Sequence, residues 1–410
     1  MIALPTDATP LIIHGHVLDV LRTIPYESIQ TCVTSWPYWG QRLYETPPQV
    51  WGGDPDHAHV YVPTPARRSR SEDDVGKTSA YGKGANSSYE ARGGELCECG
   101  AWRGEFGLEP TPEMYVYHGA LVSDEVRRVL KKDGTYWLNL ASTYATYPSG
   151  LTGEKRWKNS WQKGRDNRGA EQSGGFDKRA PGWKHKEMVP IPWMVGMALH
   201  EAGWWLRGDV IWQKKNGKHE NVRDRPYRAH EYVTMFTKGP DPYYDEAAVR
   251  QPYAPDTVRE IGIAYRNLSK TTKIGGKDVS LYERAGAQDP SELKRRIIDS
   301  MVERGGSMLP DVWLLATGNG EGRHVAVFPE TLPELCITAS SRPGDLVLDI
   351  FSGSGTTNKV ARRLGRRSIG IELSEESVTY AKEKSDTSHP ALGRWDPATP
   401  ATRAEAGEGP

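Results

Sequence analysis

The segment that most constrains the fold is an apolar strand followed by a glycine-rich loop and a helix, in the C-terminal quarter of the chain. Leu346 to Ile350 has the composition of a buried strand, Phe351 to Gly355 is a loop with two glycines, and helical sequence follows. In this layout the glycines let the backbone approach a ligand while the helix N-terminus points at it. The next predicted strand ends in Glu372, where a carboxylate could accept both ribose hydroxyls of a nucleoside. The segment predicts an α/β fold with a nucleoside site.

Helical and strand-like patterns alternate along most of the chain, which agrees with such a fold. Strands are predicted at 11–13, 31–35, 135–140, 208–212, 231–237, 345–349 and 367–372, and helices at 18–24, 112–131, 192–202, 330–339 and after 355. A tight turn at 132–134 is expected to join the second helix to its strand. Residues 44–103 are rich in Gly, Pro and Ser and too long for an ordinary loop, so they are predicted to be an insertion.

The composition sets limits on where the chain works. The 410 residues are 37% hydrophobic, carry no net charge and contain four cysteines. No apolar run is long enough to span a bilayer, and the N-terminus lacks the pattern of a signal peptide. We therefore expect a cytoplasmic protein without a membrane partner, in which the cysteines are reduced.

The charge is distributed unevenly, although its sum is zero. Residues 151–186 contain ten Lys or Arg against four acids, interleaved with Trp157, Trp161 and Trp183. Basic side chains and aromatic faces suit a phosphate backbone and unstacked bases, so this segment is predicted to contact a polyanion. The alternative is a solvated loop rich in Gly and Ser.

A second motif lies more than 300 residues before the glycine loop. Thr34 to Gly40 reads Thr-Ser-Trp-Pro-Tyr-Trp-Gly, directly after a short β-rich run. It resembles the Ser-Pro-Pro-Tyr motif of enzymes that methylate exocyclic amino groups of DNA bases, with Trp36 in place of the first proline. Phe351 to Gly355 resembles their Phe-x-Gly-x-Gly loop, and 324–329 their His-x-Ala-x-Phe-Pro element. The chain thus resembles the β-class DNA amino-methyltransferases, and the likeness extends through 104–112, 137–140 and 224–232.

The resemblance implies a Rossmann-like α/β fold with a mixed sheet of seven strands, in which the catalytic motif precedes the cofactor loop in a circularly permuted order. It divides the chain into a catalytic half (1–43 and 104–145), an insertion (44–103), a basic DNA-contacting loop (146–190), core elements (191–244), a target-recognition region (245–308), a cofactor-binding half (309–384) and a disordered tail (385–410).

The implied cofactor is S-adenosylmethionine. Its predicted binding residues are Asp349, Phe351, Ser352, Gly353, Ser354, Gly355, Thr356, Thr357 and Glu372, with His324, Phe328 and Pro329 over the methionine end. Asp349 is given a supporting role, because a carboxylate at a strand end could order the loop without touching the ligand. His16 stands where the family usually has an acid near the adenine ring, which is a departure from the family pattern.

The resemblance also assigns the catalytic residues. The Ser35 hydroxyl and the Trp36 carbonyl would accept the two amino hydrogens of the target base, which gives the nitrogen tetrahedral character and frees its lone pair to attack the methyl group. Pro37 would stiffen the loop, and Tyr38 would stack on a flipped-out base. Cys32 lies inside an apolar run and is predicted to be a core residue rather than a nucleophile.

Ser in the first position favours the N4 of cytosine as the methylated atom. Three alternatives stay open at this point: an N6-adenine enzyme of the same class, a DNA-binding relative inactivated by the changes at Trp36 and His16, and a nicotinamide oxidoreductase. The expected partner is double-stranded DNA. A cognate restriction endonuclease and a homodimer are compatible with the resemblance, as is a bacterial, archaeal or phage origin with a place at the nucleoid.

The insertion contains a candidate metal site. His57-Ala58-His59 and Cys97-Glu98-Cys99 offer four soft ligands on two segments about 38 residues apart, a set that suits tetrahedral zinc. The one-residue spacers strain chelation by each pair, so the alternative is a histidine loop with two free thiols. A metal here is predicted to clamp the insertion rather than to catalyse.

Overall fold

The computed structural model describes residues 1–41, 44, 46–64, 94–145, 180, 182–217, 219–253, 271–274, 277–280, 285–318 and 328–386. The chain divides into two compact units, one formed by 1–243 with 311–388 and the other by 244–310 with 389–410. The first unit contains the main sheet and both motifs.

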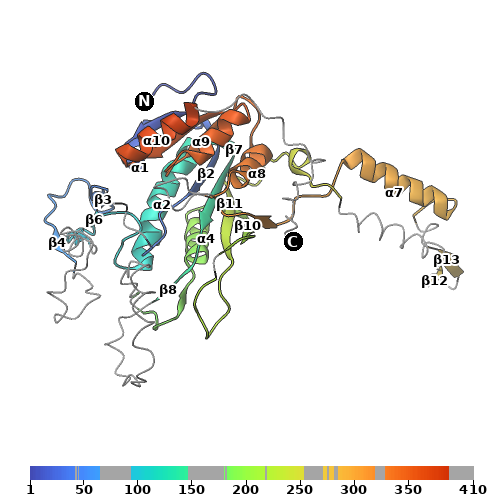
Figure 1. The fold of residues 1–410 in the computed structure, drawn as a ribbon, viewed down its shortest axis with the longest axis horizontal. Coiled ribbons are helices and arrows are strands. Elements are labelled where there is room, and N and C mark those ends of the chain that lie inside the picture. Colours follow the sequence, from blue (N-terminus) through green and yellow to red (C-terminus); the bar gives the residue numbers. More distant parts are fainter. Residues whose placement is uncertain are drawn as a thin grey trace, which may run out of the picture. The chain divides into compact units, whose positions relative to one another are not determined.

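A mixed sheet forms the centre of the first unit (Figure 1). Its strand order is β1-β16-β15-β2-β7-β11-β10-β14. The strands are β1 (Leu11–His14), β2 (Ile29–Ser35), β7 (Leu130–Leu140), β10 (Trp205–Lys214), β11 (His230–Thr237), β14 (Val312–Leu315), β15 (Leu346–Asp349) and β16 (Arg367–Glu372). Strand β11 runs antiparallel to both of its neighbours, and the other pairs are parallel.

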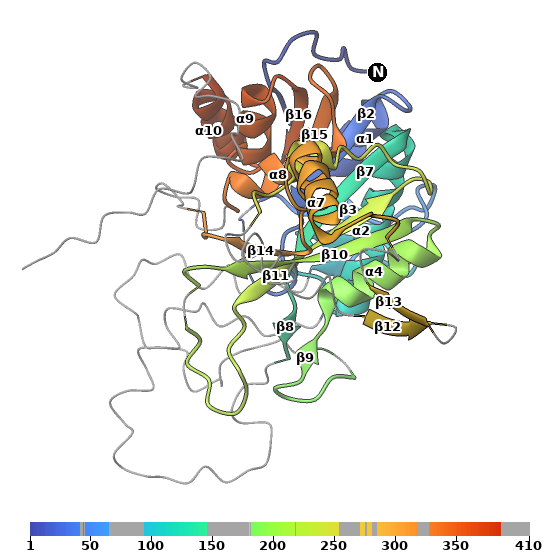
Figure 2. The same cartoon turned by 90° about the vertical axis from the view of Figure 1, so that its right-hand side faces the viewer.

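Helices cover both faces of this sheet and make a three-layer sandwich (Figures 1 and 2). One layer contains α1 (Val17–Thr23), α2 (Pro112–Val129) and α4 (Ile191–Glu201), and the other contains α8 (Thr331–Ser340), α9 (Thr356–Arg363) and α10 (Glu375–Asp386). The expected Rossmann-like α/β fold is confirmed. Strand β2, which leads into the Ser35 motif, lies beside β15, which leads into the glycine loop, although β15 comes more than 300 residues later.

The sequence explains why the central elements form. All residues of β2 except the last are buried, as an apolar, β-branched run between two covered faces requires. Helix α2 begins at an N-cap threonine, Thr111, whose hydroxyl accepts the Met114 N–H at 3.1 Å, and Pro112 occupies the first turn, where no N–H is needed. The buried face of α2 then packs on the sheet through residues such as Tyr115 and Val122.

The described residues of the insertion are tied to the main core. Four short strands form a sheet in the order β3-β6-β5-β4, with β3 at Gln49–Trp51, β4 at Val62–Pro63, β5 at Glu95–Leu96 and β6 at Trp102–Gly104. Trp51 and Trp102 pair across β3 and β6, are almost fully buried and belong to the main hydrophobic cluster. The composition of the insertion indicated a segment outside the core, but its described residues contribute to the core.

Three other expectations need correction. The main sheet has eight strands rather than seven, because β14 pairs with the end of β10 at the edge. Strand β7 begins at Leu130, directly after α2, and the expected turn at 132–134 is an irregularity in its pairing with β2. Strand β10 begins at Trp205, three residues before the predicted start, where its side chains are exposed.

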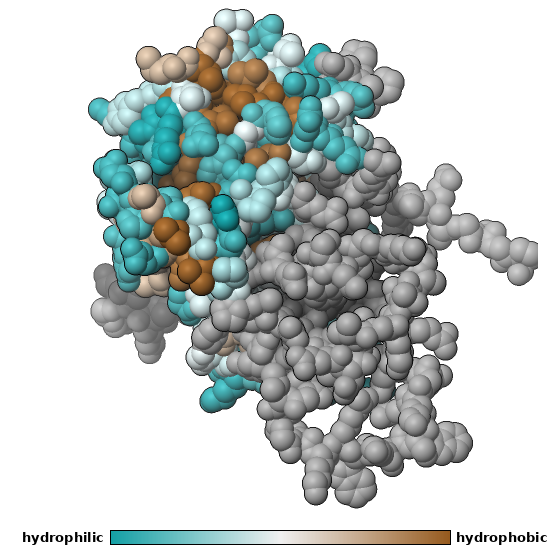
Figure 3. Space-filling view, turned by 90° about the vertical axis from the view of Figure 1, so that its left-hand side faces the viewer, coloured by the Kyte–Doolittle hydropathy of each residue, from teal (hydrophilic) through white to brown (hydrophobic). Residues whose placement is uncertain are grey.

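Smaller elements complete the described chain. A two-stranded ribbon joins β8 (Thr143–Tyr144) to β9 (Met188–Val189) in the first unit. The second unit contains the 3-10 turn η3 (Ala247–Val249), the hairpin β12 (Thr271–Ile274) with β13 (Lys277–Ser280), and α7 (Pro290–Arg304), beside a small cluster of Ala287, Leu293 and Ile297. The face shown in Figure 3 is hydrophilic with separate apolar patches. Among the described helices, none is long and apolar enough to cross a bilayer.

Candidate active site

The polar residues of the site gather at one edge of the main sheet. The parallel strands β1, β2, β7, β10, β15 and β16 all end there, and the antiparallel β11 starts there. The edge therefore carries His14, Ser35, Asn139, Lys214, Glu231, Asp349 and Glu372. In open α/β sheets, ligands bind outside the carboxyl ends of the strands, so this edge is where the fold places a site.

The two sequence motifs meet at this edge. Strands β2 and β15 are adjacent, and the Thr34 hydroxyl donates to the Asp349 carboxylate at 2.7 Å. The Thr357 hydroxyl donates across the same boundary to the Val33 carbonyl at 3.3 Å. A single ring, Phe106, stacks on Phe351 at 5.5 Å and meets Trp36 edge-on at 5.8 Å. The catalytic and cofactor loops thus share one set of supports.

Asp349 is one of these supports. Its carboxylate is buried and also accepts the Phe351 N–H at 3.2 Å, which shapes the start of the cofactor loop. Burial raises the pKa of Asp349 to about 6, against the hydrogen bonds from Thr34 and Thr357 that lower it. The side chain is thus held among protein groups.

Trp36, the residue that departs from the motif, is a core residue. Its side chain is 1% exposed and donates from Nε1 to the Tyr136 hydroxyl at 2.9 Å. The ring lies against Gly119 of α2, where an added Cβ would come within 2.2 Å of its Cζ3. It also meets Tyr115 edge-on at 5.9 Å. The larger side chain is accommodated because a glycine faces it and a hydroxyl satisfies its N–H.

The remainder of the catalytic loop is held from both sides. The Tyr115 hydroxyl donates to the Pro37 carbonyl at 3.0 Å, and Gly107 lies against Pro37 with a positive φ of 95°. The Gly40 N–H donates to the Gly107 carbonyl at 2.8 Å. Ser35 ends β2 half-buried, and its hydroxyl makes no hydrogen bond with the residues that the structure describes. An anchored loop with an available hydroxyl is a suitable platform for a polar ligand group.

Tyr38 leads to a polar network that the sequence patterns did not single out. Its hydroxyl donates to Glu231 Oε2 at 2.5 Å and lies 3.0 Å from Asn139 Oδ1. Asn139 Nδ2 donates to the same Glu231 oxygen at 3.2 Å, and Lys214 Nζ forms an ion pair with Glu231 Oε1 at 2.5 Å. Burial, with the neighbouring Glu231 charge, raises the pKa of Tyr38 well above its ordinary range. Tyr38 therefore stays a neutral donor.

The network residues lie within segments that resemble the family, at 137–140 and 224–232, but their roles depend on topology. Glu231 is the second residue of β11, Asn139 is the last but one of β7, and Lys214 ends β10, so only the antiparallel course of β11 brings the three together. Asn139 and Glu231 are 92 residues apart and both buried. The available signal was Glu231 itself, a carboxylate within a predicted buried strand, since a charge there needs a partner.

The cofactor loop has the conformation that its glycines permit. Gly353 and Gly355 have φ of 50° and 74°, and Gly355 is the N-cap of α9. Glu372 accepts the Gly353 N–H at 2.8 Å through one carboxylate oxygen and the Ser374 N–H at 2.8 Å through the other. A carboxylate has further acceptor capacity, so ribose binding by Glu372 stays a prediction.

The hydroxyls of the loop are engaged by protein groups. Ser352 donates to Asn358 Oδ1 at 3.0 Å, and Lys384 lies 3.3 Å from the hydroxyls of Ser354 and Thr356. By contrast, a Cβ at Gly353 would meet nothing within 4 Å. The loop thus offers open space beside a backbone turn, between a carboxylate and a helix N-terminus, which fits a nucleoside cofactor.

His16 closes one side of this region. Its ring meets Trp51 edge-on at 4.6 Å, and its Nε2 is buried without a hydrogen-bond partner among the described residues. Burial lowers its pKa, so the ring is neutral at pH 7. The acid of the family is replaced by an aromatic ring that packs on the insertion.

Comparison with known proteins shows the class. Residues 29–383 match the N6/N4 DNA methylase family. The chain belongs to this family. It is therefore a DNA methyltransferase that uses S-adenosylmethionine, and the nicotinamide oxidoreductase alternative is excluded.

Individual relatives agree with the family match. Type II methyltransferase M.SmaI of Serratia marcescens is 34% identical over 282 residues, which are 68% of this chain and 77% of the relative. Type II methyltransferase M.XycI of Xanthomonas campestris pv. cyanopsidis is 29% identical over 90% of this chain and 85% of the relative. Among solved structures, PvuII DNA methyltransferase (cytosine-N4-specific) covers 93% of this chain and 90% of its own, at 17% identity and a TM-score of 0.48. That likeness is too low to carry over a substrate.

Several predicted residues fall outside the described part of this methyltransferase or have other surroundings. His324 lies outside the described residues, whereas Phe328 and Pro329 precede α8 half-buried. Most of the basic loop, 146–179 and 181, is also outside them. Trp183, predicted to face a polyanion, is half-buried and packs against the main core. Lys186 forms an ion pair with Asp224 at 2.6 Å.

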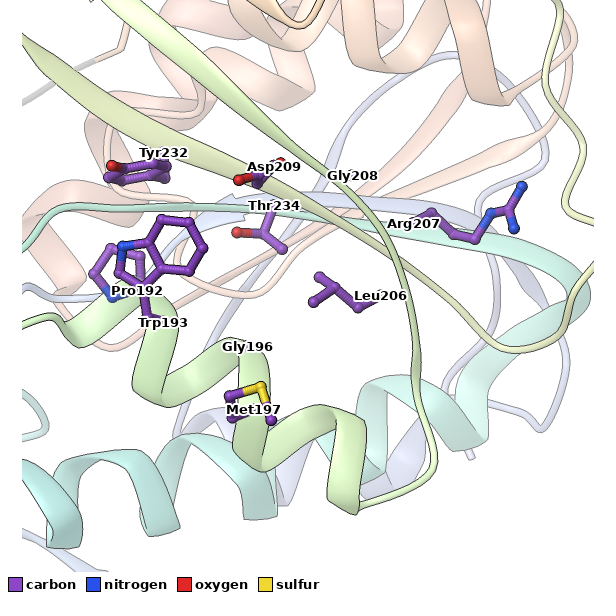
Figure 4. Close-up of a pocket in the computed structure, with 10 residues that line it drawn as sticks. All are labelled: Pro192, Trp193, Gly196, Met197, Leu206, Arg207, Gly208, Asp209, Tyr232 and Thr234. Atoms are coloured by element: carbon purple, nitrogen blue, oxygen red, sulfur yellow. The ribbon is translucent and has the colours of Figure 1, made fainter.

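One pocket lies away from the predicted site residues. It is formed between α4 and the strands β10 and β11, and Trp193, Met197, Leu206 and Tyr232 are among its lining side chains (Figure 4). None of the predicted catalytic or cofactor residues lines it. Tyr232 follows Glu231 in β11, and successive side chains of a strand point to opposite faces of the sheet. Glu231 therefore lies in the polar network on one face, and Tyr232 lines the pocket on the other.

Proposed function

We propose that this methyltransferase transfers the methyl group of S-adenosylmethionine to the exocyclic N4 of a cytosine flipped out of double-stranded DNA. The observation that carries the proposal is the position of Ser35. It ends β2 beside β15, the strand that leads into the glycine loop, and its hydroxyl makes no hydrogen bond with the described residues. No covalent enzyme intermediate is needed, and Cys32 is buried inside β2, with its thiol pKa raised well above the ordinary range by burial.

The chain's own groups would activate the amine by accepting its hydrogens. The lone pair of a cytosine amino group is delocalised into the ring, so the nitrogen is a weak nucleophile until its geometry changes. The Ser35 hydroxyl oxygen and the Trp36 carbonyl oxygen are two acceptors on consecutive residues of one anchored loop. Hydrogen bonds to both would favour a tetrahedral nitrogen, and fixed acceptors act without reorganising during the reaction.

Tyr38 would present its ring to the extruded base. Its hydroxyl is fixed by Asn139 and Glu231, and Lys214 balances the charge of Glu231. A ring restrained at its far end has little rotational freedom left to lose on stacking, which favours a preorganised wall for the flipped base.

The cofactor would be held by the loop Phe351 to Gly355 and by Glu372, with Phe328 and Pro329 over its methionine end. It supplies an electrophilic methyl group on a sulfonium. The residues of the chain contribute position: Asp349 and Thr34 join the two strands that carry the loops, and Phe106 packs between Phe351 and Trp36.

The choice of cytosine over adenine rests on serine in the first motif position, which favours N4 methylation within this family. The accommodation of Trp36 by Gly119 and Tyr136 supports an active enzyme, because the backbone carbonyl needed for the reaction does not depend on a proline side chain.

Nucleoside mass spectrometry of DNA from expressing cells tests the proposal. We expect N4-methylcytosine with the wild type and its loss with Ser35→Ala. Ser28→Ala is the matched control, because Ser28 precedes the other end of β2 and its hydroxyl donates to the Pro25 carbonyl at 2.8 Å. N6-methyladenine instead of N4-methylcytosine would overturn the base assignment. Cofactor binding by the wild type without methyl transfer to any duplex would indicate the inactive DNA-binding alternative.

A further inference from the structure

The insertion brings two histidines and two cysteines together. His57 and His59 lie on the segment between β3 and β4, and Cys97 and Cys99 lie in the turn between β5 and β6. Their ligand atoms are all within 4.8 Å of one another, and Cys99 Sγ is 3.3 Å from His59 Nδ1. This is the only group of three or more His, Cys, Asp or Glu ligands found among the described residues.

We propose that these four residues bind one zinc ion with a structural role, a site independent of the methyl-transfer chemistry. Two thiolates and two imidazoles are a complete ligand set for tetrahedral zinc. With bonds of ~2.0–2.3 Å, neighbouring ligand atoms of such a site lie roughly 3.3–3.8 Å apart. Since the ligand atoms lie within 4.8 Å of one another, the cluster needs a contraction of about 1.5 Å at most, which side-chain rotation can supply.

The backbone explains why one-residue spacers suffice. Cys97 and Cys99 lie in a tight turn, and His57 follows a turn in which its N–H donates to the Asp54 carbonyl at 3.2 Å. This backbone curvature brings the ligand atoms of both pairs into one group. The cysteine turn is closed by two hydrogen bonds: the Cys97 N–H donates to the Ala101 carbonyl at 2.8 Å, and the Gly100 N–H donates to the Cys97 carbonyl at 2.9 Å. The pairs therefore converge although the spacers are short.

A close backbone approach holds the two segments against each other. Gly53 has a φ of 77°, and a Cβ there would lie 2.7 Å from the backbone N of Ala101 and 2.4 Å from its side chain. The neighbouring residues Trp51 and Trp102 are paired and fully buried. The two segments that carry the ligand pairs are thus held together by protein packing as well.

The charge environment fits a closed site with four protein ligands. A zinc ion bound by two thiolates and two neutral imidazoles has no net charge. One acidic side chain near it, Glu98, is exposed and lies 3.7 Å from His57 Nε2, and Asp54 is a second acid close to Cys99. Because all four positions would be filled by protein atoms, no position would remain for water or substrate, which separates this site from a catalytic zinc.

The consequence for the enzyme is mechanical. Trp51 stacks on Phe106 at 4.9 Å, and Phe106 stacks on Phe351 of the cofactor loop. Zinc would join the turn before β6 to the segment after β3. This link would stabilise the small sheet, which contributes Trp51 to the stack with Phe106 and Phe351. Loss of the ion would therefore loosen the insertion first and the cofactor loop second.

The test measures metal in the full-length protein. After dialysis against metal-free buffer, we expect about one zinc per chain by elemental analysis. Cobalt substitution should give the thiolate charge-transfer and tetrahedral d–d absorption bands. Zinc should protect two thiols from a disulfide reagent until a chelator is added. Cys99→Ser and His59→Ala should lose most of the metal, whereas Cys336→Ala, in the buried face of α8, should keep it.

Two results would overturn the proposal. The first is a wild type that holds no zinc after exposure to zinc and whose thiols react equally with and without a chelator. The second is full zinc occupancy in a correctly folded double variant of Cys99 and His59. The thiol and cobalt readouts use the wild type, so they decide the question even if a variant fails to fold. Neither depends on methyl transfer, so failure here would leave the proposed function standing.

Discussion

Gly119 gives the sharpest test of how the catalytic loop is anchored. It lies in the middle of α2 against the buried ring of Trp36, and a methyl group there would come 2.2 Å from Cζ3 and 2.3 Å from Cη2. Non-bonded carbons are at their best ~3.5–4.0 Å apart, so the overlap exceeds 1 Å. The ring cannot simply retreat, because its Nε1 is bonded to Tyr136 and its other side meets Tyr115. Gly119→Ala must therefore move the loop, the helix or both.

The expected cost follows from two opposing terms. Overpacking a core costs ~1–3 kcal/mol, while replacing glycine by alanine within a helix gains ~1 kcal/mol. Gly119→Ala should thus lower the free energy of unfolding by up to ~2 kcal/mol. Gly196→Ala in α4 is the matched control, because a Cβ there would meet nothing within 4 Å. That variant should gain up to ~1 kcal/mol.

Denaturant unfolding and methyl-transfer assays on the same variants check this reasoning. Ser35 directly precedes Trp36, and a displacement of about 1 Å in a catalytic group can cost ~100-fold in rate, so Gly119→Ala should lose activity as well as stability. Trp36→Leu shortens the side chain, so the two changes should be coupled favourably in a double-mutant cycle. The reasoning is refuted if Gly119→Ala is as stable and active as Gly196→Ala, or if its effect adds independently to that of Trp36→Leu.

Three further predictions concern the carboxylates of the site. Burial raises the pKa of Asp349 from 3.8 to about 6, so ionising Asp349 destabilises the folded state. This destabilisation is absent below pH 3.8 and reaches its full size above about pH 6. Asp349→Asn should therefore be more stable than wild type at pH 8, by up to ~3 kcal/mol, and lose this advantage towards pH 4; an equal difference at both pH values in denaturant titrations would contradict this. Glu231→Gln should lower the methyl-transfer rate at unchanged affinity for S-adenosylmethionine, since it breaks the Lys214 ion pair and weakens the bond to Tyr38; calorimetry with single-turnover kinetics checks it, and an unchanged rate would show the network to be dispensable. Glu372→Ala should weaken cofactor binding at least tenfold, and more than Glu372→Gln, which keeps one acceptor for the Gly353 N–H; equal calorimetric affinities for all three proteins would remove Glu372 from the cofactor site.

The buried central strands could be predicted from the sequence because local pattern and tertiary environment agree there. Strand β16 occupies the predicted residues 367–372, and β2 and β15 differ from their predictions by only a few residues at the ends. Such strands are covered on both faces, so they read as short apolar runs. Strand β14 was missed because two of its four residues are exposed, and an edge strand with open positions lacks that signal.

The functional network shows a different limit. The sequence placed Ser35, Asp349 and Glu372 at the ends of strands and Tyr38 in the loop after the first of them. It could not place Glu231 there, because that residue lies near the start of a strand, and the start of a strand reaches the active edge only if the strand runs antiparallel to its neighbours. Strand direction is set by tertiary connections, so the Tyr38, Asn139 and Glu231 contacts appear only in the folded structure.

Tertiary contacts also explain Trp36, which in the sequence is a departure from the family motif and in the structure is a core residue. A motif comparison treats position 36 as a catalytic position, where tryptophan replaces proline and the loop loses rigidity. In the structure the rigidity comes from elsewhere: Tyr136 on β7 binds the indole N–H, and Gly119 on α2 leaves room for the ring. A proline at 36 would leave that space empty, and cavities of this size cost several kcal/mol. Tryptophan at 36 and glycine at 119 are therefore one packing solution, in which the side chain anchors the loop; in the proposed reaction the Trp36 carbonyl would accept a hydrogen from the amine of the target base.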